Sequence, residues 1–477
     1  MRITNKIIQN NSLTNINTNK TLQDTLSTQI STEKKISRPS EDPIIALRSL
    51  RLRTSVNQTD QYVNKNVEDA RSWLSVTEDA IDTLTDIITD IRKQYTKGTS
   101  DTLTPADRKI ILTDLQALSD EIYNTGNADF AGRFVFSGFR TNTPLTFQKA
   151  EIANYTINEN ESTVTVDTVC YVHQSDVEQD VYRTDITRIR LSHDNCGTDA
   201  PVLSINGNPV TCEVMSISGT DNPYEYVHDN SGKAVYIPET GEILVGSDIG
   251  TKDSITAVEV TYEKNEWNKG DLRPEHYFKC ADHTDAANVI EYNYNSSAAG
   301  EIEYNIGVSQ SLRINTTADE CYSHNIARDI DDAISALREV EEIENKLTEL
   351  KAEYELIPKT DTAALSGKQA EIDAAKKAQT FLNEKLHTLF AGGITKADGY
   401  LQTNNVALTN CGTRSKRLDL IENRLDTQLS TLKELKSENE DADLAETAIK
   451  LSSAQYAYDA ALMATSKILQ ENLLNYI

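Results

Sequence analysis

One short segment of the chain carries side chains that could bind a metal ion. The stretch EHYFKCADH contains His276, Cys280 and His283. Imidazole and thiolate groups are ligands that zinc prefers, but a structural zinc site takes four of them. No fourth ligand is evident in the sequence. We therefore interpret these three as ordinary surface residues and expect no cofactor.

Catalytic signatures are missing from the rest of the sequence. It contains no HExxH, GxSxG, GxxxxGK[ST] or GxGxxG motif, so the usual arrangements of zinc peptidases, serine hydrolases and nucleotide-binding enzymes are not indicated. We expect a protein that is not an enzyme. A metal-dependent enzyme carried by the middle of the chain remains an alternative that metal analysis would test.

Composition narrows the class of protein further. A chain of 477 residues is too long for one compact core, so several domains are expected. The net charge of −27 argues against a nucleic-acid partner, which needs a basic face. No apolar run approaches the roughly 20 residues that span a membrane. The start, MRITNKIIQNNSLTN, lacks the apolar core of a secretory signal, so we expect either a cytoplasmic protein or export by another route.

The cysteines give no sign of a disulfide framework. No CxxC motif occurs, and a chain of this length can fold without covalent cross-links. The six cysteines lie far apart, at Cys170, Cys196, Cys212, Cys280, Cys321 and Cys411.

Both ends of the chain predict long helices, because the first glycine is Gly98 and the last is Gly412. Between residues 63 and 95, apolar residues recur at alternating spacings of 4 and 3, which is typical of a coiled-coil seam. A second seam covers residues 111–122, and Pro105 with Asp107 indicates the helix start between the two seams.

The middle of the chain, residues 145–323, predicts strands. The stretch STVTVDTVCYV alternates with β-branched residues, and Asn206-Gly207 between two strand-like runs predicts a hairpin. Helix is expected again from about Asn325. Two apolar stripes separated by Pro358 predict a helical hairpin at about 339–392, and another helix after it carries Leu418 and Leu425.

The expected fold class is α+β multidomain. It consists of a long helical coiled-coil bundle from both chain ends, an inserted β-rich domain and an extra helical hairpin. The expected segments are an N-terminal helix of a terminal coiled coil (1–35), an N-terminal helical stalk (36–144), a β-rich variable outer domain (145–323), a C-terminal helical stalk with the hairpin at about 339–392 (324–435) and a C-terminal helix of the terminal coiled coil (436–477).

The two terminal helices are weak alone and suit each other. Residues 1–35 are rich in asparagine, which costs about 0.5 kcal/mol per residue in a helix, and a lone helix of this kind is marginal in water. Residues 1–35 hold five basic and two acidic residues, whereas 436–477 hold three basic and seven acidic. Frayed tails are the alternative. The residues expected at the paired interface are Ile8, Leu22, Leu26, Ile30, Leu444, Leu451, Tyr458, Leu462 and Leu469.

Half of the chain's eight phenylalanines fall in one short stretch, where the helical pattern gives way to strands. We call Phe130, Phe134, Phe136 and Phe139 the aromatic cluster. Glycine nearby lets the chain reverse where a Cβ would clash. The cluster indicates a small core at a domain junction, and it could also fix the angle of the outer domain for packing against neighbouring subunits.

Four stretches together resemble the hook–filament junction proteins of the flagellin family. KKISRPSEDPIIA resembles the turn after the first helix of flagellins and flagellar hook-associated proteins. VFSGFRTNTPLTF is similar to the Phe-Ser-Gly signature of the junction proteins, and CGTRSKRLDLIENRL resembles their late helix. The final stretch from Ala445 resembles the terminal helix of the family. The resemblance covers roughly residues 1–147 and 395–477, and the hairpin at about 339–392 departs from the family pattern.

The resemblance implies a structural subunit of the bacterial flagellum. Such a subunit joins hook to filament as an adaptor between hook-associated protein 1 and flagellin, and it assembles with itself in a ring or helical array. The resemblance further implies type III export, an export chaperone that holds the C-terminal segment, and an extracellular location. It implies neither a nucleic-acid nor a membrane partner.

Two other functions remain open. Flagellin, the filament subunit, is the nearer one, although the Pro39–Pro43 form and the Phe-Ser-Gly signature stand against it. The second is a surface adhesin-like module, in which the β-rich domain binds host or matrix and the helices serve as a stalk.

Overall fold

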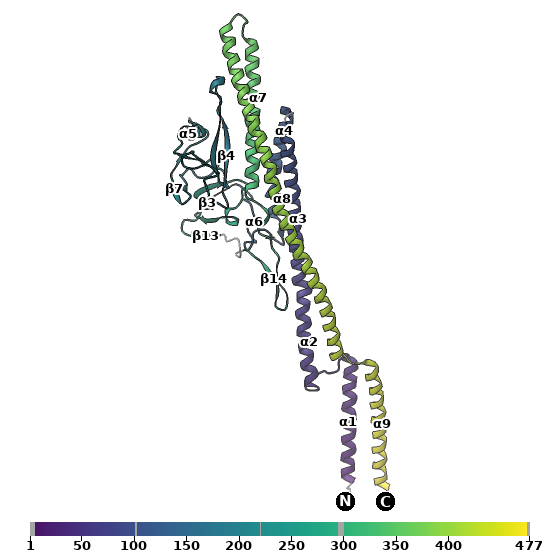
Figure 1. Ribbon diagram of the computed structural model, residues 1–477. Coiled ribbons are helices and arrows are strands. Elements are labelled where there is room, and N and C mark those ends of the chain that lie inside the picture. Colours follow the sequence, from purple (N-terminus) through teal and green to yellow (C-terminus); the bar gives the residue numbers. More distant parts are fainter. Residues whose placement is uncertain (1–4, 101–102, 220, 294–299, 475–477) are drawn as a thin grey trace. The chain divides into compact units, whose positions relative to one another are not determined.

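The computed structural model describes residues 5–100, 103–219, 221–293 and 300–474, and only the backbone of Asn5 and of residues 468–474 (Figure 1). The chain divides into two compact units. Unit 1 contains Met1–Asp69, Asn305–Ser311 and Arg417–Ile477, and unit 2 contains Ala70–Tyr304 and Leu312–Lys416. Helices at both chain ends and sheets in the middle confirm the α+β class. The five-segment division remains a prediction.

Seven long helices are found in the part of the chain that the structure describes. They are α1 (Asn5–Thr32), α2 (Pro43–Gln61), α3 (Glu68–Gly98), α4 (Pro105–Ile122), α7 (Asn325–Leu356), α8 (Thr362–Glu440) and α9 (Leu444–Leu474). A π-helical segment, η1 (Tyr62–Val67), follows α2 directly. The short helices are α5 (Pro223–Asp229), α6 (Ala318–Cys321), η2 (Thr125–Asn127), η3 (Glu178–Asp180) and η4 (Pro274–His276).

The expected seam along the first long helical stretch is buried. Each of its ten positions, from Val63 to Tyr95, is at most 5% exposed. The start of α4 also confirms the prediction. The amide of Asp107 donates to the Thr104 hydroxyl and the Asp107 carboxylate accepts from the Thr104 amide, with Pro105 at the first helical position. This capping box satisfies backbone donors that a helix start would otherwise leave unpaired.

Helices α7 and α8 form the expected hairpin, with Ile343 and Leu347 of one helix and Leu382 and Leu386 of the other buried. The separate helix expected after residue 392 is not found, because α8 runs unbroken for 79 residues. A Cβ at position 393 would lie 3.0 Å from the ring of Tyr95. The glycine here therefore permits a close helix contact instead of ending the helix.

Strands fill the middle of the chain. The larger sheet has the order β13-β12-β3-β11-β6-β7, from Ile290–Tyr292, Lys279–Asp282, Glu151–Asn160, Val258–Trp267, Val202–Ile205 and Asn208–Val210. The second has the order β4-β5-β10-β9-β8, from Thr165–Val172, Arg183–Arg190, Glu242–Val245, Ala234–Ile237 and Cys212–Val214. Two small hairpins are β1-β2 (Asp129–Phe130, Arg133–Phe134) and β14-β15 (Glu303–Gly307, Gln310–Arg313).

The Asn-Gly hairpin is confirmed between β6 and β7. Asn206 and Gly207 have φ angles of 51° and 80°, the left-handed conformation that a two-residue turn of this kind requires. Helix α5 packs against β5, β9 and β10. The apolar core between α5 and these strands consists of Val227 of the helix and Ile186, Val235, Ile237 and Leu244 of the strands.

A buried network of charges joins the second sheet to the helices within unit 2. Arg188 of β5 donates to Asp167 at 2.7 and 2.9 Å, to Glu242 at 2.5 Å and to Asp332 of α7 at 2.9 and 3.0 Å. Its neighbour on the same face of β5, Arg190, donates to Asp332 and Asp329, at 2.6 Å in each case.

The two α7 carboxylates of this network, Asp329 and Asp332, have pKa values lowered by their basic partners. Burial alone would raise the pKa of Asp332, but Arg188 and Arg190 hold it well below its usual range. Asp329 accepts two further hydrogen bonds, from Lys396 at 2.8 Å and from the Tyr400 hydroxyl at 2.5 Å, both on α8. The network therefore ties β5, α7 and α8 together.

The aromatic cluster divides between two separate contacts. The ring of Phe130 packs edge-on against Trp73 of α3, with 6.2 Å between the ring centroids. The ring of Phe136, which is buried, packs edge-on against Tyr322, with 5.0 Å between the centroids. Phe134 is half-buried, and Phe139, which we expected in the same small core, is 63% exposed. Gly138, between the last two, has a φ of +60° and redirects the chain there.

We predict that Arg190→Met lowers the free energy of unfolding of unit 2 by about 3 kcal/mol, since removing one partner of a buried charge network leaves the others unpaired. Both tryptophans, Trp73 and Trp267, lie in unit 2, so fluorescence during urea unfolding reports on it. Arg183→Met is the matched control on the same strand. Its pair with Glu384 is exposed, 42% and 54%, and should be worth at most about 1 kcal/mol. Equal losses would contradict the prediction.

We predict that Phe136→Ala costs about 3–5 kcal/mol by the same fluorescence measurement, because it empties a buried aromatic site. Phe139→Ala should change stability by less than about 0.5 kcal/mol, as exposed substitutions do. If the two substitutions had the same effect, the burial assigned to Phe136 would be wrong.

Candidate assembly site

The segments that follow α1 and precede α9 are hydrogen-bonded to each other within unit 1. We call residues 33–35 and 440–442 the terminal clasp. The amide of Lys35 donates to the Glu440 carbonyl at 2.7 Å, and the amide of Ala442 donates to the Glu33 carbonyl at 2.9 Å. Lys34 and Asp441 form an antiparallel bridge. Glu33 takes a φ of 56°, which turns the chain away from α1 into the clasp.

One carboxylate ties the terminal clasp to α2. The Glu440 side chain is only 4% exposed. It accepts two hydrogen bonds from Arg53, at 2.7 and 2.8 Å, and one from the Ser49 hydroxyl. The bond from Arg53 outweighs burial and holds the pKa of Glu440 below its usual value. Lys34 adds a salt bridge to Asp441 at 2.5 Å.

The start of α9 is fixed by an N-cap. The Asp443 carboxylate accepts from the amides of Ala445 and Glu446, at 3.0 Å each. Such a cap stabilises a helix by about 1 kcal/mol. The clasp and the cap together place the first turn of α9 beside the end of α1.

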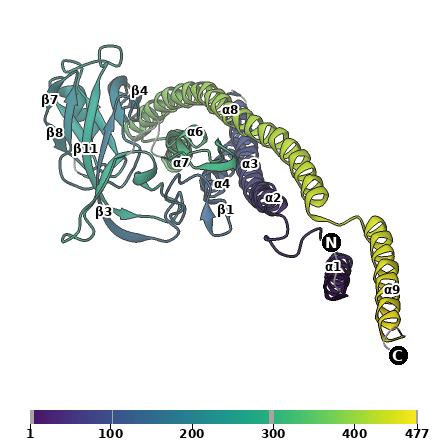
Figure 2. The same ribbon diagram turned by 90° about the horizontal axis from the view of Figure 1, so that it is seen from below.

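Helices α1 and α9 lie side by side within unit 1 (Figures 1 and 2). The most buried positions between them are Leu26, 6% exposed, and Ala454, 5% exposed. The α9 seam passes through Ala454 and Ala461, whereas the sequence analysis expected Leu462 there. Smaller side chains therefore line part of the contact.

The structure brings together some of the nine residues expected at this interface. Leu26 is buried, and four others are half-buried, namely Ile8, Ile30, Leu451 and Tyr458. Exposed are Leu22 at 49%, Leu444 at 46% and Leu462 at 43%. Leu469 lies outside the residues whose side chains the structure describes. The role of all nine in assembly remains a prediction.

Pairing leaves much apolar surface of these helices uncovered. Ile449, Tyr456 and Met463 recur every seventh residue along α9 and are 69%, 77% and 70% exposed. On α1, Ile7 and Leu13 are 50% and 55% exposed. A helix that is apolar beyond one narrow stripe needs more than one neighbour to be covered. The pair therefore presents a surface that suits further protein contacts.

Two of the three candidate zinc ligands were misjudged as surface residues, whereas His283 is exposed as expected. His276 and Cys280 are each only 5% exposed. The ring of His276 lies 3.0 Å from the Pro144 carbonyl, and burial lowers its pKa to about 4. Among the described residues, no group of three or more His, Cys, Asp or Glu side chains could hold a metal ion. No helix in the described part of the chain is long and apolar enough to cross a membrane.

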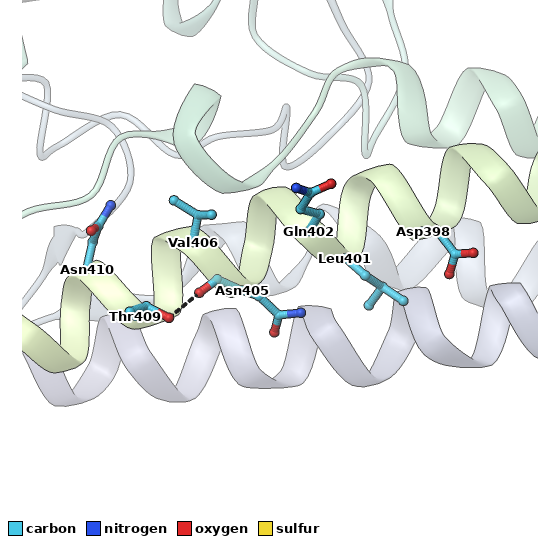
Figure 3. Close-up of a pocket in the computed structure, with 7 residues that line it drawn as sticks. All are labelled: Asp398, Leu401, Gln402, Asn405, Val406, Thr409 and Asn410. Carbon is cyan, nitrogen blue, oxygen red and sulfur yellow. Dashed lines mark hydrogen bonds between the residues drawn. The ribbon is translucent and has the colours of Figure 1, made fainter.

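A shallow groove of about 560 Å³ runs along α8 in unit 2. Figure 3 shows the seven side chains that line it, which all come from one stretch of that helix, Asp398 to Asn410. Asp398, its one charged residue, pairs with Arg92 at 2.6 Å. The Thr409 hydroxyl donates to the Asn405 carbonyl at 2.7 Å. The lining is an open helix face without a paired nucleophile and base.

The cysteines are free thiols, and most are inaccessible. Cys170 is half-buried, and the other five are buried. Burial raises the pKa of Cys196 and of Cys212 to about 12, and that of Cys411 to about 11. Each thiol therefore stays protonated at neutral pH.

Comparison with known proteins places the N-terminal part of the chain in one family. The bacterial flagellin N-terminal helical region matches residues 3–141. Flagellar hook-associated protein 3 of Escherichia coli K12 is 30% identical over 120 residues, which is 25% of this chain and 38% of that protein. The protein of the same name from Salmonella typhimurium is 28% identical over 142 residues, which is 30% of this chain and 44% of that protein.

This chain thus matches less than half the length of these two relatives. The flagellar junction protein FlgL from Legionella pneumophila has a solved structure that covers 82% of this chain and 99% of its own, at 12% identity and a TM-score of 0.29. The family match and the two relatives bear out the resemblance found in the sequence: residues 3–141 match the flagellin N-terminal helical region, and the chain is similar over part of its length to flagellar hook-associated protein 3.

Proposed function

We propose that this chain is a structural subunit of the bacterial flagellum that joins hook to filament. In this role it is an adaptor between hook-associated protein 1 and flagellin, and it assembles with copies of itself. The observation that carries the proposal is the pairing of α1 with α9, which leaves Ile449, Tyr456 and Met463 exposed. Neighbouring subunits would cover this surface, so that assembly supplies burial that the single chain lacks.

The same proposal accounts for how the chain reaches its position. An apolar α9 needs protection before assembly, so we propose that an export chaperone binds the C-terminal segment in the cytosol. Export then proceeds through the flagellar type III apparatus to an extracellular location at the hook–filament junction. The names of the relatives, flagellar hook-associated proteins, support the flagellar location within this proposal.

Flagellin and a surface adhesin-like module are the alternatives. The PSEDP turn of this chain, Pro39–Pro43, precedes α2, and Asp42 caps that helix. This feature and the Phe-Ser-Gly signature favour the junction role over flagellin. The β region could serve an adhesin only if it binds host or matrix by itself.

The proposed function is tested by complementation in the encoding bacterium, after deletion of the gene for this chain. We predict that the full chain restores attached filaments and that a variant lacking Ala445–Ile477 does not. Normal tryptophan fluorescence of the variant would show that unit 2 is still folded. Immunogold labelling should mark only the hook–filament joint. Labelling along the filament would favour flagellin, and a deletion strain with normal filaments but lost adhesion would favour the adhesin.

We predict that Glu440→Gln weakens the terminal clasp by about 1 kcal/mol, because it removes a charged acceptor whose partner Arg53 is half exposed. The pKa of Glu440 is lowered by folding, so its contribution is present above the unfolded carboxyl pKa and is lost as the pH falls through the lower folded value. Thermal unfolding by circular dichroism should therefore separate wild type from variant at pH 7, and the difference should shrink as the pH is lowered through the folded-state pKa. Glu438→Gln, exposed on the same helix, is the control and should change nothing.

A further inference from the structure

The outward face of α2, in unit 1, is apolar. Ile44, Leu47 and Leu50 follow one another at a spacing of three and are 72%, 54% and 62% exposed. The opposite side of the helix carries its buried residues, Val56 among them. Large apolar side chains gathered on one exposed face mark an interaction site more often than single ones do.

Basic side chains accompany this apolar face. Arg48 and Arg51 are exposed, and neither has a salt bridge within the part of the chain that the structure describes. The third arginine of the helix, Arg53, is bound to Glu440. In a chain with a net charge of −27, α2 is thus a locally positive helix with two arginines available.

The outward face of α4, in unit 2, is complementary in shape and charge. Ile110 is 59% exposed, and the small residues Ala106, Thr113 and Ala117 lie beside it on the same side of the helix. The last turn adds two exposed acidic residues, Asp120 and Glu121, which have no salt bridge among the described residues. Small residues form a shallow surface into which leucine side chains can pack.

We propose that the α2 face of one copy of this chain docks on the α4 face of a second copy. The proposal rests on the proposed function, since it names a surface by which the subunits assemble. Leu47 and Leu50 would pack against Ala117 and Ile110. Arg48 and Arg51 would pair with Asp120 and Glu121 of the second copy.

A second copy is the occupant that the charges favour. Copies with a net charge of −27 repel one another, so a contact between them needs local attraction of this kind. The two faces differ, so each copy keeps one free face after docking. Such a head-to-tail contact extends into a ring or a helical array.

Charge reversal in the full chain tests the pairing. We predict that Arg48→Glu with Arg51→Glu, and separately Asp120→Lys with Glu121→Lys, each weaken self-association about tenfold or more. Sedimentation velocity over a concentration series at low salt measures the effect. An equimolar mixture of the two variants should regain wild-type association, since each contact between unlike copies again joins opposite charges. Lys351→Glu with Lys359→Glu, two exposed positions on and just after α7, is the matched control and should associate as wild type does.

Cross-linking tests the proximity independently. A Leu47→Cys copy mixed with an Ala117→Cys copy should form a disulfide-linked dimer on mild oxidation, whereas Leu47→Cys mixed with Ile152→Cys should not. Ile152 is 77% exposed on β3, so the control cysteine is accessible. The native thiols are buried or half-buried and should not compete.

Any of three results would overturn the docking. The first is a wild-type chain that stays monomeric together with no disulfide between positions 47 and 117. The second is charge-reversal variants that associate as wild type does, and the third is an equimolar mixture of the two variants that does not regain association. The proposed function fails in a different way. If the chain associates and cross-links as described but does not restore attached filaments, the docking stands and the junction role is wrong. If the wild-type chain restores attached filaments and both charge-reversal variants restore them equally well, the docking is wrong and the junction role stands.

Discussion

Unit 2 depends on two arginines of β5 whose charges are shielded from water. Arg188 and Arg190 are 5% and 1% exposed at their side chains, and Asp332 of α7 accepts hydrogen bonds from both. Pulling the sheet from the helices would leave these charges unpaired in a medium that solvates them poorly, at a cost of several kcal/mol. The β region is therefore an insertion in the sequence but not an independent body. It has to fold and move together with α7 and α8.

In unit 1, polar hydrogen bonds rather than buried groups hold the terminal helices together. Its terminal helices are joined through hydrogen bonds of the clasp and through a contact in which few of the described side chains are well buried, Leu26 and Ala454 among them. Such a pair is held in register by polar groups while most of its apolar surface stays available. In the proposed role this is an advantage. The directional bonds set which helix lies beside which, and neighbouring subunits then supply the hydrophobic stabilisation that makes the arrangement permanent.

The sequence predicted those features of the fold that depend on residues close together in the chain. The 4-and-3 spacing from Val63 to Tyr95, the Asn206-Gly207 turn and the helix start at Pro105 with Asp107 were all confirmed, because each depends on neighbours within a few residues. Of the N-terminal stretches that carried the family resemblance, KKISRPSEDPIIA lies within residues 3–141, which match the flagellin N-terminal helical region, and VFSGFRTNTPLTF begins there.

Contacts between distant residues could not be predicted in this way. Arg188 and Asp332 are 144 residues apart, and Ser49 and Glu440 are 391 apart, so no periodicity connects them. The unbroken α8 was missed because the effect of Gly393 depends on the ring of Tyr95 from another helix. The α9 seam was placed on Leu462 because hydrophobicity was weighed above size, whereas the contact runs through Ala454 and Ala461. In the same way, Phe139 was assigned to a core by composition, although the turn at Gly138 directs it outward.

The state of the six thiols has a consequence for the two environments that the proposed export route connects. Disulfide exchange requires a thiolate, and burial both raises the pKa of these cysteines and blocks the approach of a second sulfur. The folded chain thus offers almost no thiol for disulfide exchange to act on. Its cysteines would stay free thiols in a reducing cytosol and in oxygenated surroundings outside the cell, and its architecture would need no disulfide-forming enzyme on either side.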